Sequence, residues 1–249
     1  FEMWTALFMF LAGGSFSLYY RAWIKGPSAI LRNTEFRAYL GIVLTAILLI
    51  ALNLIIEMGL DSFTSIRAAI FQVTSLSTTG FVSADFETWP TFSKLLLLLL
   101  MLIGGCAGST ASGIKVARVI LLVRNARAVI LQKMNPHRVI DISLGGAHVD
   151  SAMLLRTGTF FFLYITIIFI TAFLLTMDGL LPFDAIAVSV TTIGNIGPAF
   201  GIVSATSTYA PLSDFAKTIL CFSMLLGRLE IFTLLILLRP SFWRKTKRW

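Results

Sequence analysis

Two short apolar segments of this 249-residue chain run into turns rich in threonine and glycine, and a long apolar segment follows each turn. The first turn covers residues 77–81 (STTGF) and the second covers residues 191–198 (TTIGNIGP). Irregular backbone survives at membrane depth only where it is buried in protein or lines a watery cavity, because lipid cannot satisfy its N–H and C=O groups. The two turns therefore predict a pore.

The composition indicates a membrane protein. Apolar residues make up 57% of the chain, charged residues only 13%, and the mean hydropathy is +0.88, whereas soluble domains carry about 25% charge. About 20 consecutive apolar residues are needed to cross a hydrocarbon core of roughly 30 Å. We expect spans at residues 3–20, 39–56, 95 onward, 157–176 and 214–238.

The distribution of charge predicts the orientation in the membrane. Basic residues follow the first span, occupy the stretch 124–156 and end the chain, whereas the loops between them are mainly acidic. By the positive-inside rule, the basic loops and the C-terminus are cytoplasmic. Both turns then lie toward the outer side. The net charge of +8 is explained by this topology, so nucleic acid is not expected as a partner.

The order of segments predicts an all-α integral membrane protein with two repeated modules, 39–131 and 157–249. Each module has a span, a half-length helix, a loop and a second span. We expect residues 1–38 to be the last span of a preceding module with a cytoplasmic linker. Residues 132–156 are expected to form a cytoplasmic linker, in which the alternating stretch 139–149 around Gly145 and Gly146 is typical of a hairpin.

The half-length helices, predicted at 63–77 and 183–190, are too short to cross the bilayer. Fifteen residues at 1.5 Å each cover only about 22 Å. A helix that descends from outside points its partially negative C-terminal end at the membrane centre, which favours a cation there.

Glycine in each turn predicts an ion filter. Gly80 and Gly194 are expected to adopt conformations closed to residues with a Cβ, so that several carbonyls face one axis. Rings of such carbonyls, with threonine hydroxyls, replace the hydration shell of K⁺. One Thr-x-Gly tripeptide is common in ordinary loops, but two copies at matching places in a repeat favour a filter.

The segment 95–130 is too long for a single span, since it would measure about 54 Å as one helix. Residues 104–115 within it hold four glycines and three hydroxyl residues. A phosphate-binding loop is excluded, because Ile114 separates Gly113 from Lys115 and the flanks are membrane helices. Close helix packing at Gly104 and Gly108 is the alternative. We favour an intramembrane loop, since each small polar residue weakens a helix by about 0.5 to 1 kcal/mol.

Two charges lie in the last apolar run. Arg228 and Glu230 are expected to face the protein interior or a watery cavity, because intramembrane charges are costly. Glu230 is a possible partner of Arg228. Cys106 and Cys221 fall in apolar segments and are expected to pack there.

Taken in order, the motifs at 78–81, 104–115, 192–198 and 227–230 resemble those of the TrkH/KtrB family of potassium-uptake proteins, and the resemblance covers essentially the whole chain. In that family four span–pore-loop–span modules surround one K⁺ pathway, an intramembrane loop gates it, and an arginine in the last span opposes the loop. The resemblance implies filter residues Thr78, Thr79, Gly80, Phe81, Thr192, Ile193, Gly194 and Asn195. It implies a gate made of Gly104, Gly105, Gly108, Ser109, Thr110, Gly113 and Lys115, with Arg228 and Glu230 as pore-facing charges.

The resemblance also implies K⁺ uptake across a bacterial plasma (inner) membrane. Since this chain would supply two of the four modules, we expect it to lack the first two. A homodimer and a cytoplasmic, nucleotide-binding regulatory subunit like TrkA are the implied partners. No cofactor and no enzymatic activity are expected, and the only metal is the K⁺ at the filter.

Two other functions are considered. A non-conducting structural or receptor subunit predicts that Gly80→Ser and Gly194→Ser leave ion flux unchanged. An intramembrane hydrolase with Ser109 as nucleophile would need a base at membrane depth, and both His137 and His148 lie in the cytoplasmic stretch. The hydrolase is therefore disfavoured.

Overall fold

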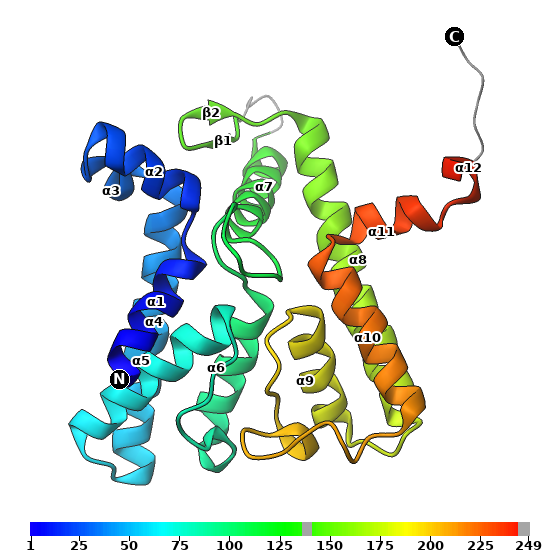
Figure 1. The fold of residues 1–249 in the computed structure, drawn as a ribbon. Helices are drawn as coiled ribbons and strands as arrows, with labels where there is room; N and C mark the ends of the chain where they lie inside the picture. Colours follow the sequence, from blue (N-terminus) through cyan, green and yellow to red (C-terminus); the bar gives the residue numbers. More distant parts are fainter. Residues whose placement is uncertain (136–140, 244–249) are drawn as a thin grey trace.

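The computed structural model describes residues 1–135 and 141–243, and these residues are almost entirely helical (Figure 1). The helices are α1 (Glu2–Gly13), α2 (Phe16–Lys25), α3 (Ser28–Arg32), α4 (Thr34–Met58), α5 (Ser62–Thr78), α6 (Thr91–Leu102), α7 (Val116–Met134), α8 (Ser151–Thr176), α9 (Pro182–Ile193), α10 (Asp214–Arg228), α11 (Ile231–Leu238) and α12 (Pro240–Trp243). Two 3₁₀ turns, η1 (Phe86–Thr88) and η2 (Gly201–Val203), lie in the loops after α5 and α9. A short hairpin joins β1 (Ser143–Leu144) to β2 (Ala147–His148).

Two helices of the described residues, α4 and α8, are long and apolar enough to cross a membrane, and the bent pair α10–α11 would make a third. The ends of α4 follow from its sequence. Asn33 accepts a hydrogen bond from the Phe36 N–H at 2.9 Å, as a helix N-cap does. Gly59 ends the helix in the left-handed region, with φ +63°. The apolar run between these caps is the expected membrane span.

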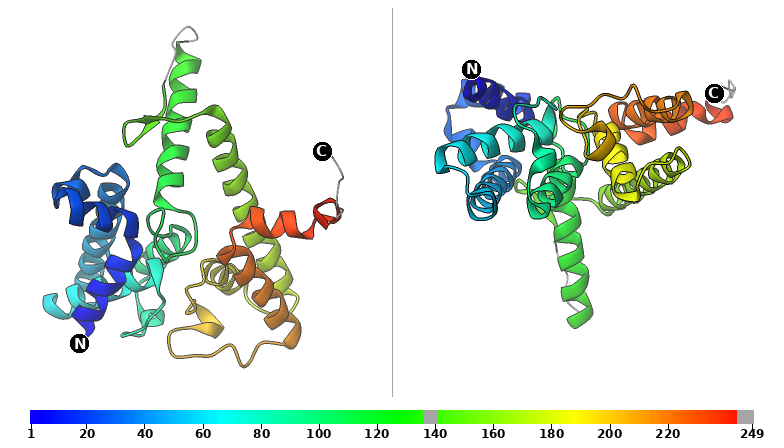
Figure 2. Two further views of the ribbon diagram at one scale, coloured as in Figure 1. Left: turned by 45° about the horizontal axis from the view of Figure 1, so that its top comes forward. Right: turned by 90° about the horizontal axis from the view of Figure 1, so that it is seen from below.

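The order of long helix, short helix, loop and helix occurs twice. Helix α5 packs against α4, and α9 packs against α8 in the same way. The turns that precede α5 and α9 lie at the lower edge of Figure 1, and the hairpin lies at its upper edge. Viewed from below, α6 lies between the helices α1–α5 and the helices α8–α10 (Figure 2). Both half-length helices therefore exist, and α6 brings the two halves of the chain into contact through α9.

Burial divides the apolar side chains into a core and an outer surface. The half-length helices are the most enclosed parts, since residues 71–77 of α5 and 185–193 of α9 include long buried runs. Long helices α4 and α8 instead expose large apolar side chains such as Leu48 and Phe173. Apolar side chains exposed in this number on a helical protein suit contact with lipid.

The predicted span at 3–20 is not one continuous helix, because the chain leaves the helix between α1 and α2. The Gly13 carbonyl accepts the N–H of Cys106 at 2.8 Å, and the Phe16 N–H donates to the Gly108 carbonyl at 3.3 Å. These bonds to a distant loop replace bonds along a continuous helix. The predicted break after residue 95 is confirmed, since α6 ends at Leu102 and α7 begins at Val116.

The last predicted span, 214–238, is not straight. The helix axis bends by 111° between its two parts, α10 and α11. Glu230 separates them with φ +56°, a left-handed conformation that continues no right-handed helix. The run therefore bends sharply two residues after Arg228.

The predicted hairpin is confirmed over residues 143–148, with Ser143 opposite His148. Gly145 and Gly146 form its turn with φ +60° and +87°, as a two-residue hairpin turn requires. Arg124 of α7 donates to the Ser143 carbonyl and so ties the hairpin to the helix. Residues 139, 140 and His137 lie outside the described residues.

Candidate filter loops and central loop

Residues 77–81, the last two residues of α5 and the three that follow, are here named loop I. It folds back on its helix, since the N–H groups of Thr79 and Gly80 both donate to the Ser75 carbonyl, at 2.8 and 2.9 Å. The Ser75 hydroxyl in turn donates to the Phe81 carbonyl. Gly80 has φ +81°, a conformation that glycine adopts without a steric penalty.

Loop I touches residues 191–198, the last three residues of α9 and the five that follow, which are here named loop II. A Cβ placed on Gly80 would lie 1.8 Å from the Ile196 carbonyl oxygen and 3.1 Å from Cδ of Pro198. No real Cβ approaches another heavy atom so closely, so only glycine fits at position 80. The structure thus brings the two predicted filter turns together, although they are more than 100 residues apart in the sequence.

Loop II is held by a buried threonine. The Thr191 carbonyl accepts the Ile196 N–H at 3.0 Å. The Thr191 hydroxyl donates to the Pro198 carbonyl at 2.7 Å and accepts the Gly197 N–H at 3.1 Å. The turn itself uses positive φ at Asn195 (+53°) and Gly197 (+113°).

The expectation that Gly194 adopts a conformation closed to other residues is wrong. Its φ is −74° and ψ is −11°, and its N–H donates to the Val190 carbonyl at 2.9 Å. Gly194 therefore continues α9 by one residue, and the chain reverses only afterward. A Cβ at position 194 would lie 3.1 Å from Cδ1 of Ile196 and 3.1 Å from the Val190 oxygen, so space is tight there although the backbone is ordinary.

The threonines predicted for the filter donate their hydroxyl hydrogens to their own helices. Thr78 donates to the Thr74 carbonyl at 3.0 Å, and Thr192 donates to the Val188 carbonyl at 2.7 Å. Thr79 makes a longer contact of 3.5 Å with the Ser75 carbonyl. A hydroxyl that has donated its hydrogen retains lone pairs for a cation.

Ser75, near the end of α5, and Thr191 of loop II are not among the residues predicted for the filter. Their hydroxyls hold the carbonyl that follows each turn. The sequence does contain a sign of these two residues. A run of hydroxyl residues ends each half-length helix, and the run begins before the Thr-x-Gly tripeptide.

The loop that contains η1 and the loop that contains η2 contact each other. One oxygen of Glu87, in η1, accepts the Gly201 N–H of η2 at 3.1 Å, and the other pairs with Lys94 at 3.0 Å. Tyr209 donates its hydroxyl to the Gly197 carbonyl. Burial raises the pKa of Tyr209 to about 12, so this phenol remains a donor at neutral pH.

Residues 103–115, between α6 and α7, are here named the central loop. Its two ends pair with each other, since the Gly104 N–H donates to the Ile114 carbonyl at 3.0 Å and the Ile114 N–H donates to the Leu102 carbonyl at 3.1 Å. A Cβ on Gly104 would meet the Ser112 carbonyl oxygen at 1.9 Å. The glycines here serve close packing within a loop, so helix-to-helix packing at Gly104 and Gly108 does not occur.

Glu35, in the first turn of α4, is a third residue that the sequence interpretation missed. One carboxylate oxygen accepts the N–H of Ala107 at 2.6 Å and the N–H of Ala117 at 3.2 Å. Ala117 lies in the first turn of α7, where a negative charge is favourable. Glu35 thus joins the central loop to the start of α7. Its signal in the sequence is an acidic residue between Arg32 and Arg37, within a basic segment.

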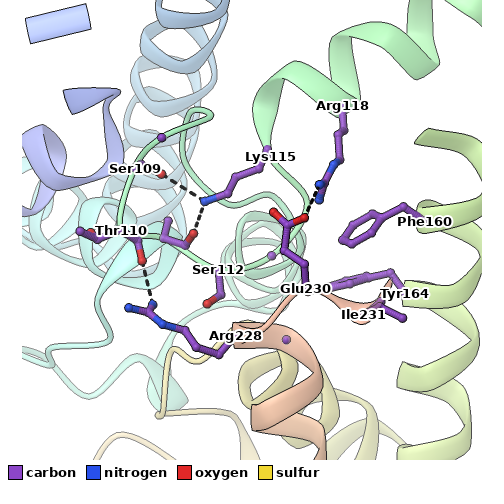
Figure 3. A pocket seen from close by; sticks show the side chains of 14 residues that line it. Ser109, Thr110, Ser112, Lys115, Arg118, Phe160, Tyr164, Arg228, Glu230 and Ile231 are labelled. Carbon is purple, nitrogen blue, oxygen red and sulfur yellow. Dashed lines mark hydrogen bonds and ion pairs between the residues drawn. The ribbon is translucent and has the colours of Figure 1, made fainter. Parts of the chain in front are cut away.

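The middle of the central loop faces α10 (Figure 3). Arg228 donates to the Thr110 carbonyl at 3.0 Å. Lys115 lies 3.4 Å from the Ser109 hydroxyl and also donates to the Ala111 carbonyl. The predicted loop residues and Arg228 are therefore in direct contact.

Glu230 does not pair with Arg228. It forms an ion pair with Arg118 of α7 at 2.9 Å (Figure 3), because the bend after α10 directs Glu230 toward α7 rather than along the same helix as Arg228. The guanidinium of Arg118 also lies 3.9 Å from the ring centroid of Phe160, within the range of a cation–π contact. Arg118 is a further residue that the sequence interpretation did not select.

A cavity of about 320 Å³ lies beside the central loop. Its charged lining consists of Lys115, Arg118, Arg228 and Glu230, three positive groups against one negative group. Among the residues that the structure describes, no group of three or more His, Cys, Asp or Glu side chains could hold a metal ion. A cation here would meet the Glu230 carboxylate together with carbonyl and hydroxyl oxygens of the central loop.

Comparisons with known proteins identify the relatives of this chain. The family model named "TrkH: Cation transport protein" matches residues 1–245. The "Trk system potassium uptake protein TrkH" of Salmonella typhimurium is 36% identical over 244 residues, and that of Escherichia coli (strain K12) is 34% identical. Each of these alignments covers 96% of this chain and 50% of the relative.

Among solved structures, the potassium transporter TrkH from Vibrio parahaemolyticus matches with a TM-score of 0.90 at 33% identity. The match covers 98% of this chain and 53% of the other. The chain therefore spans about half the length of the relatives that it matches. Since the family model extends over nearly every residue, the chain belongs to the TrkH family of cation transport proteins.

Proposed function

We propose that this chain contributes two loops to the filter of a K⁺ uptake pathway. The observation that carries the proposal is the contact of loop I with loop II at Gly80 and Ile196, where two half-length helices end. The C-terminal ends of α5 and α9 carry partial negative charge. Loop carbonyls and the lone pairs of Thr78 and Thr192 can then replace the hydration shell of K⁺.

The names of the relatives support K⁺ as the ion, since they are potassium uptake proteins. A four-loop ring needs two loops more than this chain contains. We place these in N-terminal modules of the same protein, because the relatives are about twice as long as the aligned region.

The central loop is the proposed gate. It lies next to Arg228, and the adjoining cavity has an excess of positive charge from Lys115, Arg118 and Arg228 over Glu230. Positive charge in a low-dielectric cavity repels K⁺. Movement of the loop and of the Arg228 side chain would remove this barrier.

The proposed location is the bacterial inner membrane, with α2, α3 and the hairpin on the cytoplasmic side. The basic residues of α2 and α3 support that orientation, as do Arg124, Arg127 and Lys133 of α7, which leads toward the hairpin. A homodimer and a nucleotide-binding regulatory subunit that docks on the cytoplasmic face are the proposed partners.

The test is growth of a strain deficient in K⁺ uptake that expresses the complete protein. Wild type should restore growth at low K⁺, and Gly80→Ser should abolish it because the side chain collides with Ile196. Gly59→Ser is the matched control, since Gly59 also has positive φ but has no atom within 4 Å of a Cβ. Failure of wild type to restore growth, or equal permeation of K⁺ and Na⁺ in liposomes, would overturn the proposal.

Two other functions make different predictions. A non-conducting structural or receptor subunit predicts normal flux with Gly80→Ser. A serine hydrolase gains one contact from the structure, since Lys115 lies 3.4 Å from the Ser109 hydroxyl and supplies a basic residue that the sequence interpretation did not consider. Lys115 also donates to the Ala111 carbonyl, a bond that holds it in place as a donor rather than as a base. Labelling of Ser109 by a serine-directed phosphonate would favour the hydrolase.

A further inference from the structure

Asn195 of loop II contacts both its neighbouring helix and the central loop. Its side-chain Nδ2 lies 3.2 Å from the Met224 carbonyl oxygen of α10 and 3.4 Å from the hydroxyl of Ser112. A third acceptor, the Ile193 carbonyl oxygen, lies at 3.4 Å. Besides its own loop, this amide therefore touches two parts of the protein, α10 and the central loop, that are distant from it in the sequence.

The backbone of Asn195 holds this amide in place. Its φ of +53° is left-handed, a region in which asparagine is enriched among the non-glycine residues. The Asn195 N–H donates to the Thr192 carbonyl at 3.0 Å, and the next N–H, of Ile196, donates to the Thr191 carbonyl at 3.0 Å. A change in the position of loop II would therefore move the Asn195 amide with it.

A second route joins the same two loops through α10. A Cβ on Gly227 would lie 1.8 Å from the Ile193 carbonyl oxygen and 3.0 Å from Nδ2 of Asn195. The next residue, Arg228, donates to the Thr110 carbonyl at 3.0 Å. Loop II and the central loop are thus connected both directly and through a single turn of α10.

We propose that Asn195 is a positioning residue that couples loop II to the central loop, so that the position of the gate alters conduction by the filter. This inference rests on the proposed function. The cavity of about 320 Å³ beside the central loop supplies space for a second position of residues 108–113. Coupling of this kind is reciprocal, so K⁺ at the filter should also alter the central loop.

Coupling and ion ligation make different predictions for Asn195. A ligand would set the ratio of K⁺ to Na⁺ permeation, and its loss would change that ratio. A coupling residue would set the ratio of flux in the activated and resting states, and its loss would leave the selectivity unchanged.

The variants are chosen to leave the backbone undisturbed. Asn195→Gly keeps the left-handed conformation and removes the amide, whereas Asn195→Asp keeps the shape and removes the donor. Ser112→Ala removes the partner in the central loop. Ser83→Ala, at an exposed position beyond loop I, is the control.

The complete protein in liposomes supplies the first measurement. Asn195→Gly, Asn195→Asp and Ser112→Ala should each change the ratio of activated to resting K⁺ flux about two- to tenfold, the effect of one hydrogen bond on an equilibrium. The double variant Asn195→Gly/Ser112→Ala should change it no more than the larger single change. Fully additive effects, unchanged flux ratios or a changed K⁺/Na⁺ ratio would overturn the coupling.

A second measurement does not depend on flux. With every other cysteine replaced, the rate at which a maleimide labels the buried Cys106 of the central loop should differ between K⁺ and Na⁺ buffers. Asn195→Gly should abolish that difference, and Ser83→Ala should preserve it. No ion dependence in wild type would overturn the coupling, whereas wild type without any K⁺ flux would overturn the proposed function. If Asn195→Gly does not fold, Ser112→Ala and Asn195→Asp give the same test.

Discussion

Gly227 lies so close to the Ile193 carbonyl oxygen that a Cβ at position 227 would stand 1.8 Å from it. This contact brings α10 against the end of α9. Because Arg228 is the next residue, the same contact sets where the arginine meets the Thr110 carbonyl. A glycine that looks like part of an apolar run thus determines the position of the charge beside the central loop.

Gly227→Ala should destabilise the protein by about 1–3 kcal/mol, the usual cost of an extra group in a packed site, and should reduce K⁺ flux. The thermal unfolding midpoint and liposome flux measure the two effects. Gly41→Ala is the control, because a Cβ at position 41 of α4 meets nothing within 4 Å. Equal effects of the two substitutions would mean that the contact with Ile193 is unimportant.

Gly80→Ala should be more harmful than Gly194→Ala, although both positions lie in the predicted filter. At position 80 the new Cβ would meet backbone at 1.8 Å, whereas at position 194 it would meet Ile196 Cδ1 and a carbonyl at 3.1 Å in an ordinary conformation. Selectivity for K⁺ over Na⁺ in liposomes is the measurement. Gly59→Ala is the control, because Gly59 has a positive φ like Gly80 but no neighbouring atom near a Cβ. It should conduct as wild type does. A loss of selectivity in Gly59→Ala would mean that backbone strain, rather than the collision with Ile196, explains the effect of Gly80→Ala.

Glu35→Ala should loosen the central loop, because two backbone N–H groups lose a charged acceptor. Each hydrogen bond to a charged group contributes about 1.5–3 kcal/mol. Cys106 in a background without other cysteines reports the result, since its thiol is buried and should react faster with a maleimide after the substitution. Glu35→Gln, which keeps an acceptor oxygen, should react at an intermediate rate, and a Cys106 rate unaffected by Glu35→Ala would show that Glu35 does not hold the loop.

Asp178, in the turn after α8, should make stability depend on acid pH. Hydrogen bonds from the Ser213 hydroxyl and the Ser213 N–H lower the pKa of its carboxyl group. Since the pKa in the folded state lies below that in the unfolded state, the stabilisation is present above about pH 4 and is lost as pH falls further. The difference in thermal midpoint between wild type and Asp178→Asn should therefore shrink between pH 7 and pH 3. A difference in thermal midpoint that stays constant from pH 7 to pH 3 would show that Asp178 does not make the stability depend on pH.

The half-length helices could be predicted because their signals are local. The helix start at Asp61, the proline at position 182 and the glycines after each run all act on neighbouring residues. The break between α6 and α7 could be predicted for the same reason, since four glycines and three hydroxyl residues within twelve positions oppose a helix whatever surrounds them.

The break between α1 and α2 was not predicted, although Gly13, Gly14 and Ser15 weaken a helix locally. The hydrogen bonds that fix it are made to the central loop, about 90 residues away. The ion-pair partner of Glu230 also could not be predicted from neighbouring residues. The nearness of Glu230 to Arg228 in the sequence suggested a pair, but the left-handed φ at Glu230 directs it to Arg118, 112 residues distant.

By itself the sequence determined that this is a helical membrane protein with two half-length helices, each ending in a Thr/Gly turn, since hydropathy, charge and turn chemistry act through neighbouring residues and the bilayer. Only the tertiary structure decided that Gly80 meets Ile196, that Glu35 holds the central loop, and that Asn195 joins loop II to that loop. These contacts link residues from 72 to more than 100 positions apart, and their geometry depends on how the helices pack.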